Sequence, residues 1–191
     1  MNKQRCWWCG NDPLYITYHD TEWGVPVKDD AKLFEFLTLE TFQAGLSWIT
    51  VLRKRENFRK AFDAFNYKKI AAYSEEKVQE LLQDAGIIRN KLKVRATITN
   101  AQAFMKVQDE FGSFSNYIWG FVDGKPIQNN FQNKNDVPAN TPLSDTISKD
   151  LKKRGFKFVG TTVVYAHMQA TGMVNDHVTN CFRHKEVSRM N

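Results

Sequence analysis

Hydrophobic positions along the chain recur at the spacing of α-helices. From residue 29 onward, a segment that Asp29 or Asp30 can cap carries apolar side chains at every third or fourth position, and Gly45 interrupts it. Ser47 can cap a second helix, which carries the next apolar stripe. Strict alternation of apolar and polar residues, the mark of a half-buried strand, is rare throughout. The pattern therefore predicts an all-α fold.

Further helices are predicted toward the C-terminus. The helical spacing continues over residues 74–82, 90–105, 111–122 and 161–171. Ser144 can cap one more helix, and a last one is expected to begin near Asn175 or Asp176. Residues 123–142, with Asn-rich tracts and three Pro, are expected to form a long surface connection. The polar tail after Cys181 is expected to be loose.

The length and composition suit a single globular unit over residues 1–191. Hydrophobic residues make up 42% of the chain, and fourteen Phe and five Trp exceed what a disordered chain carries. Apolar runs stay well short of the roughly 20 residues that span a bilayer. The segment from Met1 to Arg5 has no apolar core of a signal peptide. We therefore expect a cytoplasmic, monomeric protein without membrane contact.

The charge balance is basic, with a formal net charge of +6. Positive side chains neutralise phosphates and so give affinity for nucleic acid that does not depend on its sequence. The basic runs at residues 53–55 and 152–154 are, taken singly, more often solvated faces than binding sites. The balance favours a polyanionic partner without identifying it.

Cysteine and histidine residues gather near both ends of the chain. His177 and Cys181 are four residues apart, so a helix there would place them on one face, within reach of one metal ion. Cys6, Cys9 and His19 lie in a turn-rich segment with little predicted regular structure. Zinc in structural sites takes four nitrogen or sulfur ligands. The fourth ligand could be Cys9 or His19, and the Cys6-x-x-Cys9 spacing is the more conventional.

Glu40 falls on the apolar stripe of the first long predicted helix. A buried carboxylate is costly unless it is paired, and the alternative is a boundary residue that reaches water or an Arg. Just beyond it come Gly45, an exposed Leu46 and Trp48. A base flipped out of a duplex needs an aromatic face, a polar group for its edge and a residue that fills the gap. These side chains could supply all three, although core packing is the commoner use of a single Trp.

Residues 75–105 fit a helix–hairpin–helix. Gly86 could take a positive φ at the turn, and the second helix would begin at Asn90 and Lys91. Backbone N–H groups at such a helix start, with basic side chains nearby, suit a DNA phosphate. The motif is weak by itself, because many paired helices have a glycine turn.

Several longer segments together resemble one known family. They are residues 12–20 (DPLYITYHD), 22–26 (EWGVP), 43–51 (QAGLSWITV), 84–89 (DAGIIR), 152–162 (KKRGFKFVGTT) and 174–178 (VNDHV). In this unbroken order they closely resemble the DNA-3-methyladenine glycosylase I family, of the helix–hairpin–helix glycosylase superfamily. The match runs from about residue 5 to residue 181. It implies hydrolytic release of 3-methyladenine from alkylated double-stranded DNA.

The resemblance also implies roles for individual residues. The structural zinc ligands would be Cys6, His19, His177 and Cys181. The base pocket would use Glu40, Tyr18, Trp48 and Trp8, with Tyr15 nearby. The DNA contacts would be the wedging turn of Gly45 and Leu46 and the hairpin residues Gly86 and Lys91. Cys9 is then an extra residue, Leu92 departs from the small or polar residue expected in the hairpin, and His167 is a packing residue.

The implied fold has two parts, a helix–hairpin–helix lobe over residues 31–111 and a zinc-stapled lobe over 1–30 plus 112–191. Since 3-methyladenine in DNA is cationic and leaves as a neutral base, little acid catalysis is needed, and an anionic Glu40 would favour it over adenine. We expect an abasic site as product and no covalent Lys intermediate. The alternatives are a zinc-stapled DNA-binding protein without this activity and a metalloenzyme that uses the Cys/His site directly.

Overall fold

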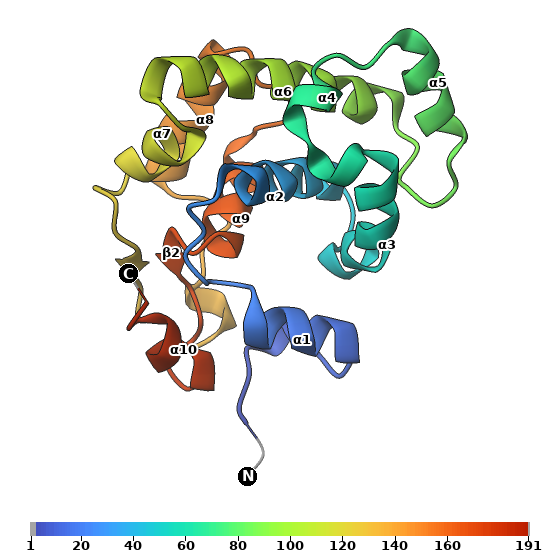
Figure 1. Cartoon of the computed structure of the whole chain (residues 1–191). Helices are drawn as coiled ribbons and strands as arrows, with labels where there is room; N and C mark the ends of the chain where they lie inside the picture. The colour runs from blue at the N-terminus through green and yellow to red at the C-terminus, as the bar shows by residue number, and fades with distance from the viewer. Residues whose placement is uncertain (1–2, 191) are drawn as a thin grey trace.

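Helices account for almost all regular structure within residues 3–190, which the computed structural model describes (Figure 1). The α-helices are α1 (Pro13–Thr21), α2 (Asp30–Gln43), α3 (Trp48–Ala61), α4 (Tyr67–Ile70), α5 (Glu75–Gln83), α6 (Lys91–Phe111), α7 (Phe114–Gly120), α8 (Pro142–Lys153), α9 (Thr161–Ala170) and α10 (Phe182–Val187). The short elements are the 3-10 helices η1 (Trp7–Cys9), η2 (Asp63–Phe65) and η3 (Lys134–Asp136) and the strands β1 (Ile127–Gln128) and β2 (Val174–Asn175). The all-α class is confirmed.

Helix α2 lies at the centre of the molecule, in contact with α3, α6, α7 and α9 (Figure 1). Every residue from 33 to 42 is buried, so the helix is covered on all sides and not only along the predicted stripe. His167 of α9 ties the two helices together through a 3.2 Å hydrogen bond to the carbonyl of Leu33. Burial lowers the pKa of His167 to about 4, so it packs as a neutral side chain.

Helix caps explain several boundaries. Asp29, rather than Asp30, caps α2 by accepting a 2.8 Å hydrogen bond from the backbone of Lys32. Ser47 occupies the cap position of α3, but its hydroxyl bonds to the side chain of Thr50 instead of the backbone. The cap of α8 is Thr141, because Thr141 and the predicted cap Ser144 bond each other's backbone in a capping box.

The segment before residue 30 is more regular than predicted. Asp12 caps α1 and Pro13 occupies its first position, a combination that favours helix starts. The segment also includes η1. Met1 and Asn2, part of the stretch examined for a signal peptide, lie outside the described residues.

The C-terminal part differs most from prediction. No helix begins at Asn175 or Asp176, because residues 174–175 are extended and pair in parallel with β1. The Asn175 side chain donates to the Gln128 side chain and to the His184 carbonyl, which holds this extended course. The tail after Cys181 is not loose, since it forms α10.

Helices α1 and α10, near opposite ends of the sequence, lie on the same side of the molecule (Figure 1). None of the helices in residues 3–190 is long and apolar enough to cross a membrane. The division into two lobes stays a prediction.

Candidate functional site

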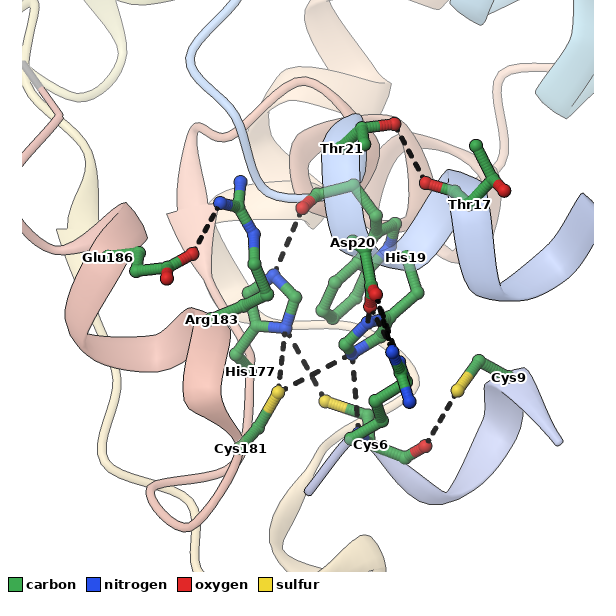
Figure 2. A network of polar contacts seen from close by, with 12 residues as sticks. Cys6, Cys9, Thr17, His19, Asp20, Thr21, His177, Cys181, Arg183 and Glu186 are labelled. Atoms are coloured by element: carbon green, nitrogen blue, oxygen red, sulfur yellow. Dashed lines mark hydrogen bonds and ion pairs between the residues drawn. The ribbon is translucent and has the colours of Figure 1, made fainter. Parts of the chain in front are cut away.

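Four side chains from the two ends of the chain meet in one buried cluster, formed by Cys6, His19, His177 and Cys181 (the metal cluster; Figure 2). Their ligand atoms all lie within 4.8 Å of one another. The Cys6 Sγ is 3.5 Å from Nδ1 of His177, and the Cys181 Sγ is 3.4 Å from Nε2 of His19. Tetrahedral zinc bonds place sulfur and nitrogen ligands roughly 3.6 Å apart. The cluster therefore has the size and donor set of a four-coordinate metal site.

Outer hydrogen bonds determine which nitrogen of each histidine faces the cluster. Nδ1 of His19 lies 2.8 Å from Oδ1 of Asp20, which itself forms an ion pair with Arg5. Nε2 of His177 lies 3.0 Å from the carbonyl oxygen of Trp23. A hydrogen bond from the outer nitrogen fixes the tautomer and ring orientation of a metal-ligating histidine. The inward atoms are thus Nε2 of His19 and Nδ1 of His177.

Cys9 lies outside the metal cluster, because its thiol donates to the carbonyl of Cys6, 3.3 Å away (Figure 2). His177 and Cys181 do not share a helix face, which corrects the prediction. Cys181 is the N-cap of α10, and a turn closed by the Cys181 N–H to Val178 carbonyl bond brings it beside His177. The two residues meet through this turn rather than through helical spacing.

Aromatic rings connect the metal cluster with a neighbouring cavity. Trp8 of η1 has its ring centroid 5.2 Å from that of His19 and 5.0 Å from those of Trp23 and Tyr15. Trp23 in turn meets His177 edge-on at 4.7 Å. Trp8 and Trp23 therefore contact metal-cluster residues and also line the cavity. The position of this aromatic wall depends on the cluster behind it.

The cavity has a volume of about 260 Å³ and brings together all five residues predicted for the base pocket. Its lining comprises Trp7, Trp8, Tyr15, Tyr18, Trp23, Glu40, Gln43, Trp48, Val137, Pro138, Ala166 and Gln169. The rings of Tyr18 and Trp48 lie 5.4 Å apart across the α1–α3 contact. Such an aromatic lining suits a flat, polarisable ligand.

Glu40 is the one carboxylate in this lining. It is 3% exposed, and burial raises its pKa to about 8. Its Oε2 atom and Nε1 of Trp48 are buried without a hydrogen-bond partner in residues 3–190. Buried polar atoms are almost always hydrogen-bonded, so this pair is a sign of a site shaped for a ligand. A raised pKa favours the neutral form of Glu40 near pH 7, and the anionic role expected for Glu40 toward a cationic base stays a prediction.

Comparison with protein families then identifies the chain. A family model described as methyladenine glycosylase matches residues 8–184. The chain belongs to the methyladenine glycosylase family. DNA-3-methyladenine glycosylase 1 of Escherichia coli is 53% identical over 178 residues, which cover 93% of this chain and 95% of that protein. The DNA-3-methyladenine glycosylase of Haemophilus influenzae is 48% identical over 177 residues, covering 93% and 96%.

Solved structures agree with this assignment. A crystal structure of a 3-methyladenine DNA glycosylase I matches with a TM-score of 0.92 and 55% identity, covering 94% of this chain and 98% of that one. A 3-methyladenine DNA glycosylase I from Staphylococcus aureus, whose structure addresses 3-methyladenine recognition, matches with a TM-score of 0.91 and 35% identity, covering 93% and 95%. The family resemblance and the mostly helical fold expected from it are confirmed.

In this glycosylase, α2 carries Glu40 and ends at an exposed turn. Gly45 has a φ of +85°, a conformation that favours glycine, and a Cβ there would meet no atom within 4 Å. Leu46 is 42% exposed, and its N–H donates to the carbonyl of Gln43 at 2.6 Å. An apolar side chain thus projects from a short turn that begins beside Gln43, a residue of the pocket lining.

The predicted hairpin lies between α5 and α6, but Gly86 does not have a positive φ. A Cβ at this position would instead be crowded, at 2.9 Å from Oδ1 of Asp84 and 3.2 Å from the Asn57 side chain. The Gly86 N–H donates to the same Asp84 oxygen at 2.7 Å. The Lys54 amine holds the hairpin from α3, at 3.2 Å from the Gly86 carbonyl.

The start of α6 is already partly capped. Oδ1 of Asn90 accepts hydrogen bonds from the backbone of Leu92 at 3.0 Å and of Lys93 at 3.1 Å. Lys91 is exposed, and Leu92 is 68% exposed. A phosphate at this helix start would therefore meet the Lys91 side chain and an apolar Leu92 rather than four unpaired N–H groups.

The basic run at residues 53–55 is not simply a solvated face. Arg53 forms an ion pair with Asp12, and Lys54 binds the hairpin as described. Arg55 is 5% exposed and pairs with Glu22 and Glu35. Through these side chains, residues 53–55 join α3 to α1, to α2 and to the hairpin. The charge pattern of the sequence does not reveal these three contacts.

Sequence reasoning missed part of the pocket wall. The missed residues are Trp7, Trp23, Gln43, Val137, Pro138, Ala166 and Gln169. Gln169 is the most informative, since its side-chain amide donates to Oδ2 of Asp176 at 2.8 Å, and Tyr165 donates to the same oxygen. This fixes the orientation of an amide at the pocket wall. Its only signal in the sequence is a polar residue within an apolar helix.

Proposed function

We propose that this glycosylase flips 3-methyladenine out of alkylated double-stranded DNA into the cavity and hydrolyses its bond to the sugar, leaving an abasic site. The observation that carries the proposal is the buried Glu40, with an unpartnered oxygen, in an aromatic cavity of about 260 Å³. Stacking on Trp48 and Tyr18 would bind the base, with Trp8 and Tyr15 closing the same wall. The relatives named DNA-3-methyladenine glycosylase support the choice of base.

The raised pKa of Glu40 gives the pocket a means of selection. With a pKa of about 8, the carboxyl is mainly neutral when the pocket is empty at pH 7. A cationic base nearby favours the charged form of a carboxyl and lowers its pKa. Glu40 would therefore ionise when 3-methyladenine enters. Neutral adenine would either leave Glu40 protonated or face a buried charge that it does not compensate, so it would gain no charge pairing. The attacking water is assigned no activating base, because the family resemblance implies no dedicated catalytic Asp.

For DNA contact, we assign Gly45 and Leu46 as the wedge that fills the gap left by the base. Support comes from the exposure of Leu46 and from the open space around Gly45, which lets a duplex approach the backbone. The hairpin residues Gly86 and Lys91 are assigned to the DNA backbone, beside the start of α6.

We assign one structural zinc ion to the metal cluster. Two thiols and two imidazoles are a zinc donor set, and the sulfur–nitrogen distances of 3.4–3.6 Å suit tetrahedral coordination. With four protein ligands, Cys6, His19, His177 and Cys181, no position remains for substrate. Zinc would then stabilise the fold behind the aromatic wall and take no part in the chemistry.

The test is release of free bases from methylated duplex DNA, resolved by chromatography, for the wild type and Glu40→Gln. We expect the wild type to release 3-methyladenine and the variant to lose tenfold or more, about the effect of one hydrogen bond to a charged group. Borohydride should trap no protein–DNA adduct. A folded, zinc-loaded wild type that binds duplex DNA in a salt-sensitive way without releasing a base would overturn the proposal in favour of a DNA-binding protein.

A further inference from the structure

Lys93 is a buried lysine that the pocket and the metal cluster do not use. It is the third residue of α6 and is 6% exposed. Burying an ammonium group is costly unless hydrogen bonds compensate it. Its amine donates to the carbonyl of Phe42 at 2.9 Å and to that of Ala44 at 2.7 Å. The buried charge is thus committed to two main-chain oxygens of one turn.

That turn is the end of α2 immediately before Gly45 and Leu46. The carbonyls at a helix C-terminus lack partners within the helix and carry the negative end of its dipole. The Gln43 carbonyl is bonded by the N–H of Leu46, and its two neighbours are bonded by Lys93. The lysine therefore satisfies the carbonyls on either side of Gln43 and fixes the course of the chain into the turn.

Lys93 is also joined to the hairpin through its own backbone. Its N–H donates to Oδ1 of Asn90, at the last residue before α6. Lys93 is two positions after Lys91, the proposed backbone contact. Lys93 therefore links the hairpin to the turn that carries Leu46. Its two carbonyl partners lie 51 and 49 residues earlier in the sequence.

We propose that Lys93 is a positioning residue for base flipping, which fixes the Gly45–Leu46 turn at a set place relative to the hairpin that grips the DNA backbone. The inference rests on the proposed roles of that turn and of the hairpin. With the amine in place, a duplex seated on the hairpin meets Leu46 at a fixed position. Without it, two carbonyls lose their partners and the turn is free to move while the hairpin still binds DNA.

The variant Lys93→Met keeps the length of the side chain and removes its charge and donors. Three affinities are measured, for an undamaged duplex, for a duplex with a tetrahydrofuran abasic site, and for free 3-methyladenine by tryptophan fluorescence. We expect the preference for the abasic-site duplex to fall about tenfold, the effect of losing roughly 1.4 kcal/mol of wedge binding. Affinities for undamaged duplex and free base should stay within about twofold, since the hairpin and the pocket keep their residues.

Lys93→Arg, which can donate to both carbonyls, should regain most of the preference. Lys106→Met serves as the matched control, because Lys106 is an exposed lysine on the same helix. If all three affinities fall in parallel with the melting temperature, the role of Lys93 is purely structural and the inference is overturned. An unchanged preference for the abasic-site duplex in Lys93→Met would also overturn it. If Lys93→Met does not fold, Lys93→Gln keeps an amide donor group without the charge and allows the same comparison.

The proposed function is tested separately by wild-type base release. A wild type that releases 3-methyladenine while Lys93→Met keeps its abasic-site preference would refute only the role of Lys93. A wild type that prefers the abasic-site duplex but releases no base would refute only the proposed chemistry.

Discussion

Replacing Glu40 by Gln should make this glycosylase more stable at neutral pH while it impairs base release. The side chains are nearly isosteric, so at low pH, where Glu40 is protonated, the two proteins should be similarly stable. As pH rises, the unfolded wild type loses the Glu40 proton near the ordinary pKa of 4.5, whereas the folded protein retains it up to about 8. The folded state then binds more protons, and wild-type stability falls with pH through this window.

The magnitude follows from the two pKa values. From 4.5 to 8 is 3.5 pH units, and at ~1.36 kcal/mol per unit the full effect is ~5 kcal/mol. Between pH 5.5 and pH 8, a practical range, 2.5 units give ~3 kcal/mol. For a chain of this size, that difference corresponds to roughly 6–12 °C in melting temperature.

The assay is urea unfolding of both proteins at several pH values, at a fixed zinc concentration. The free energy of unfolding of Glu40→Gln minus that of the wild type should grow up to about pH 8 and then level off. Glu76→Gln is the control, because the Ser74 hydroxyl lowers the pKa of the exposed Glu76, which therefore titrates below the range tested. A Glu40 difference that does not change with pH would refute the reasoning, since it would mean that the carboxyl is already ionised in the empty pocket.

Three further predictions concern the zinc, the wedge and the hairpin. Cys181→Ser should lose zinc and melt at a lower temperature, whereas Cys9→Ser should keep one zinc per chain. The zinc content is measured with a chromophoric chelator, and equal loss in both variants would place Cys9 among the ligands. Leu46→Ala should reduce base release from duplex DNA about tenfold, because the wedge is altered and the pocket is not. The affinity for free 3-methyladenine, measured by tryptophan fluorescence, should stay unchanged, and weakened binding of the free base would contradict the prediction. Gly86→Ala should lower the free energy of unfolding in urea by roughly 1–3 kcal/mol, since its Cβ would lie 2.9 Å from a carboxylate oxygen. Gly120→Ala, with open space around its Cβ, should be neutral or stabilising. Equal effects of the two substitutions would exclude crowding as the reason for glycine at position 86.

Much of the fold follows from local patterns in the sequence. Apolar spacing and capping residues locate α2, α3, α5, α9 and the start of α6 to within a few residues, because helix formation depends largely on neighbours three and four positions away. The start of α1 was missed although Asp12 and Pro13 carry a helix-start signal, since the surrounding turn residues obscured it.

The candidate site was only partly accessible from the sequence. The sequence pairs His177 with Cys181 correctly, but through a shared helix face that does not exist. The pairing of Val174 and Asn175 with a second strand overrides the local helical preference there. Nothing in the spacing could choose His19 over Cys9, since that choice depends on how α1 turns its buried face toward the cluster. Such contacts are set by the tertiary fold, which the resemblance to a family conveys and local patterns do not.

The pairing of the two chain ends has a consequence for synthesis of the protein. Cys6 and its partner His177 are 171 residues apart, so the wall that Trp8 and Trp23 form is complete only after the segment around residue 181 has left the ribosome. Glu40 and Trp48 are made early, but their pocket stays open on one side until that moment. The pocket wall is therefore the last part of the site to gain its supporting contacts as the chain is made.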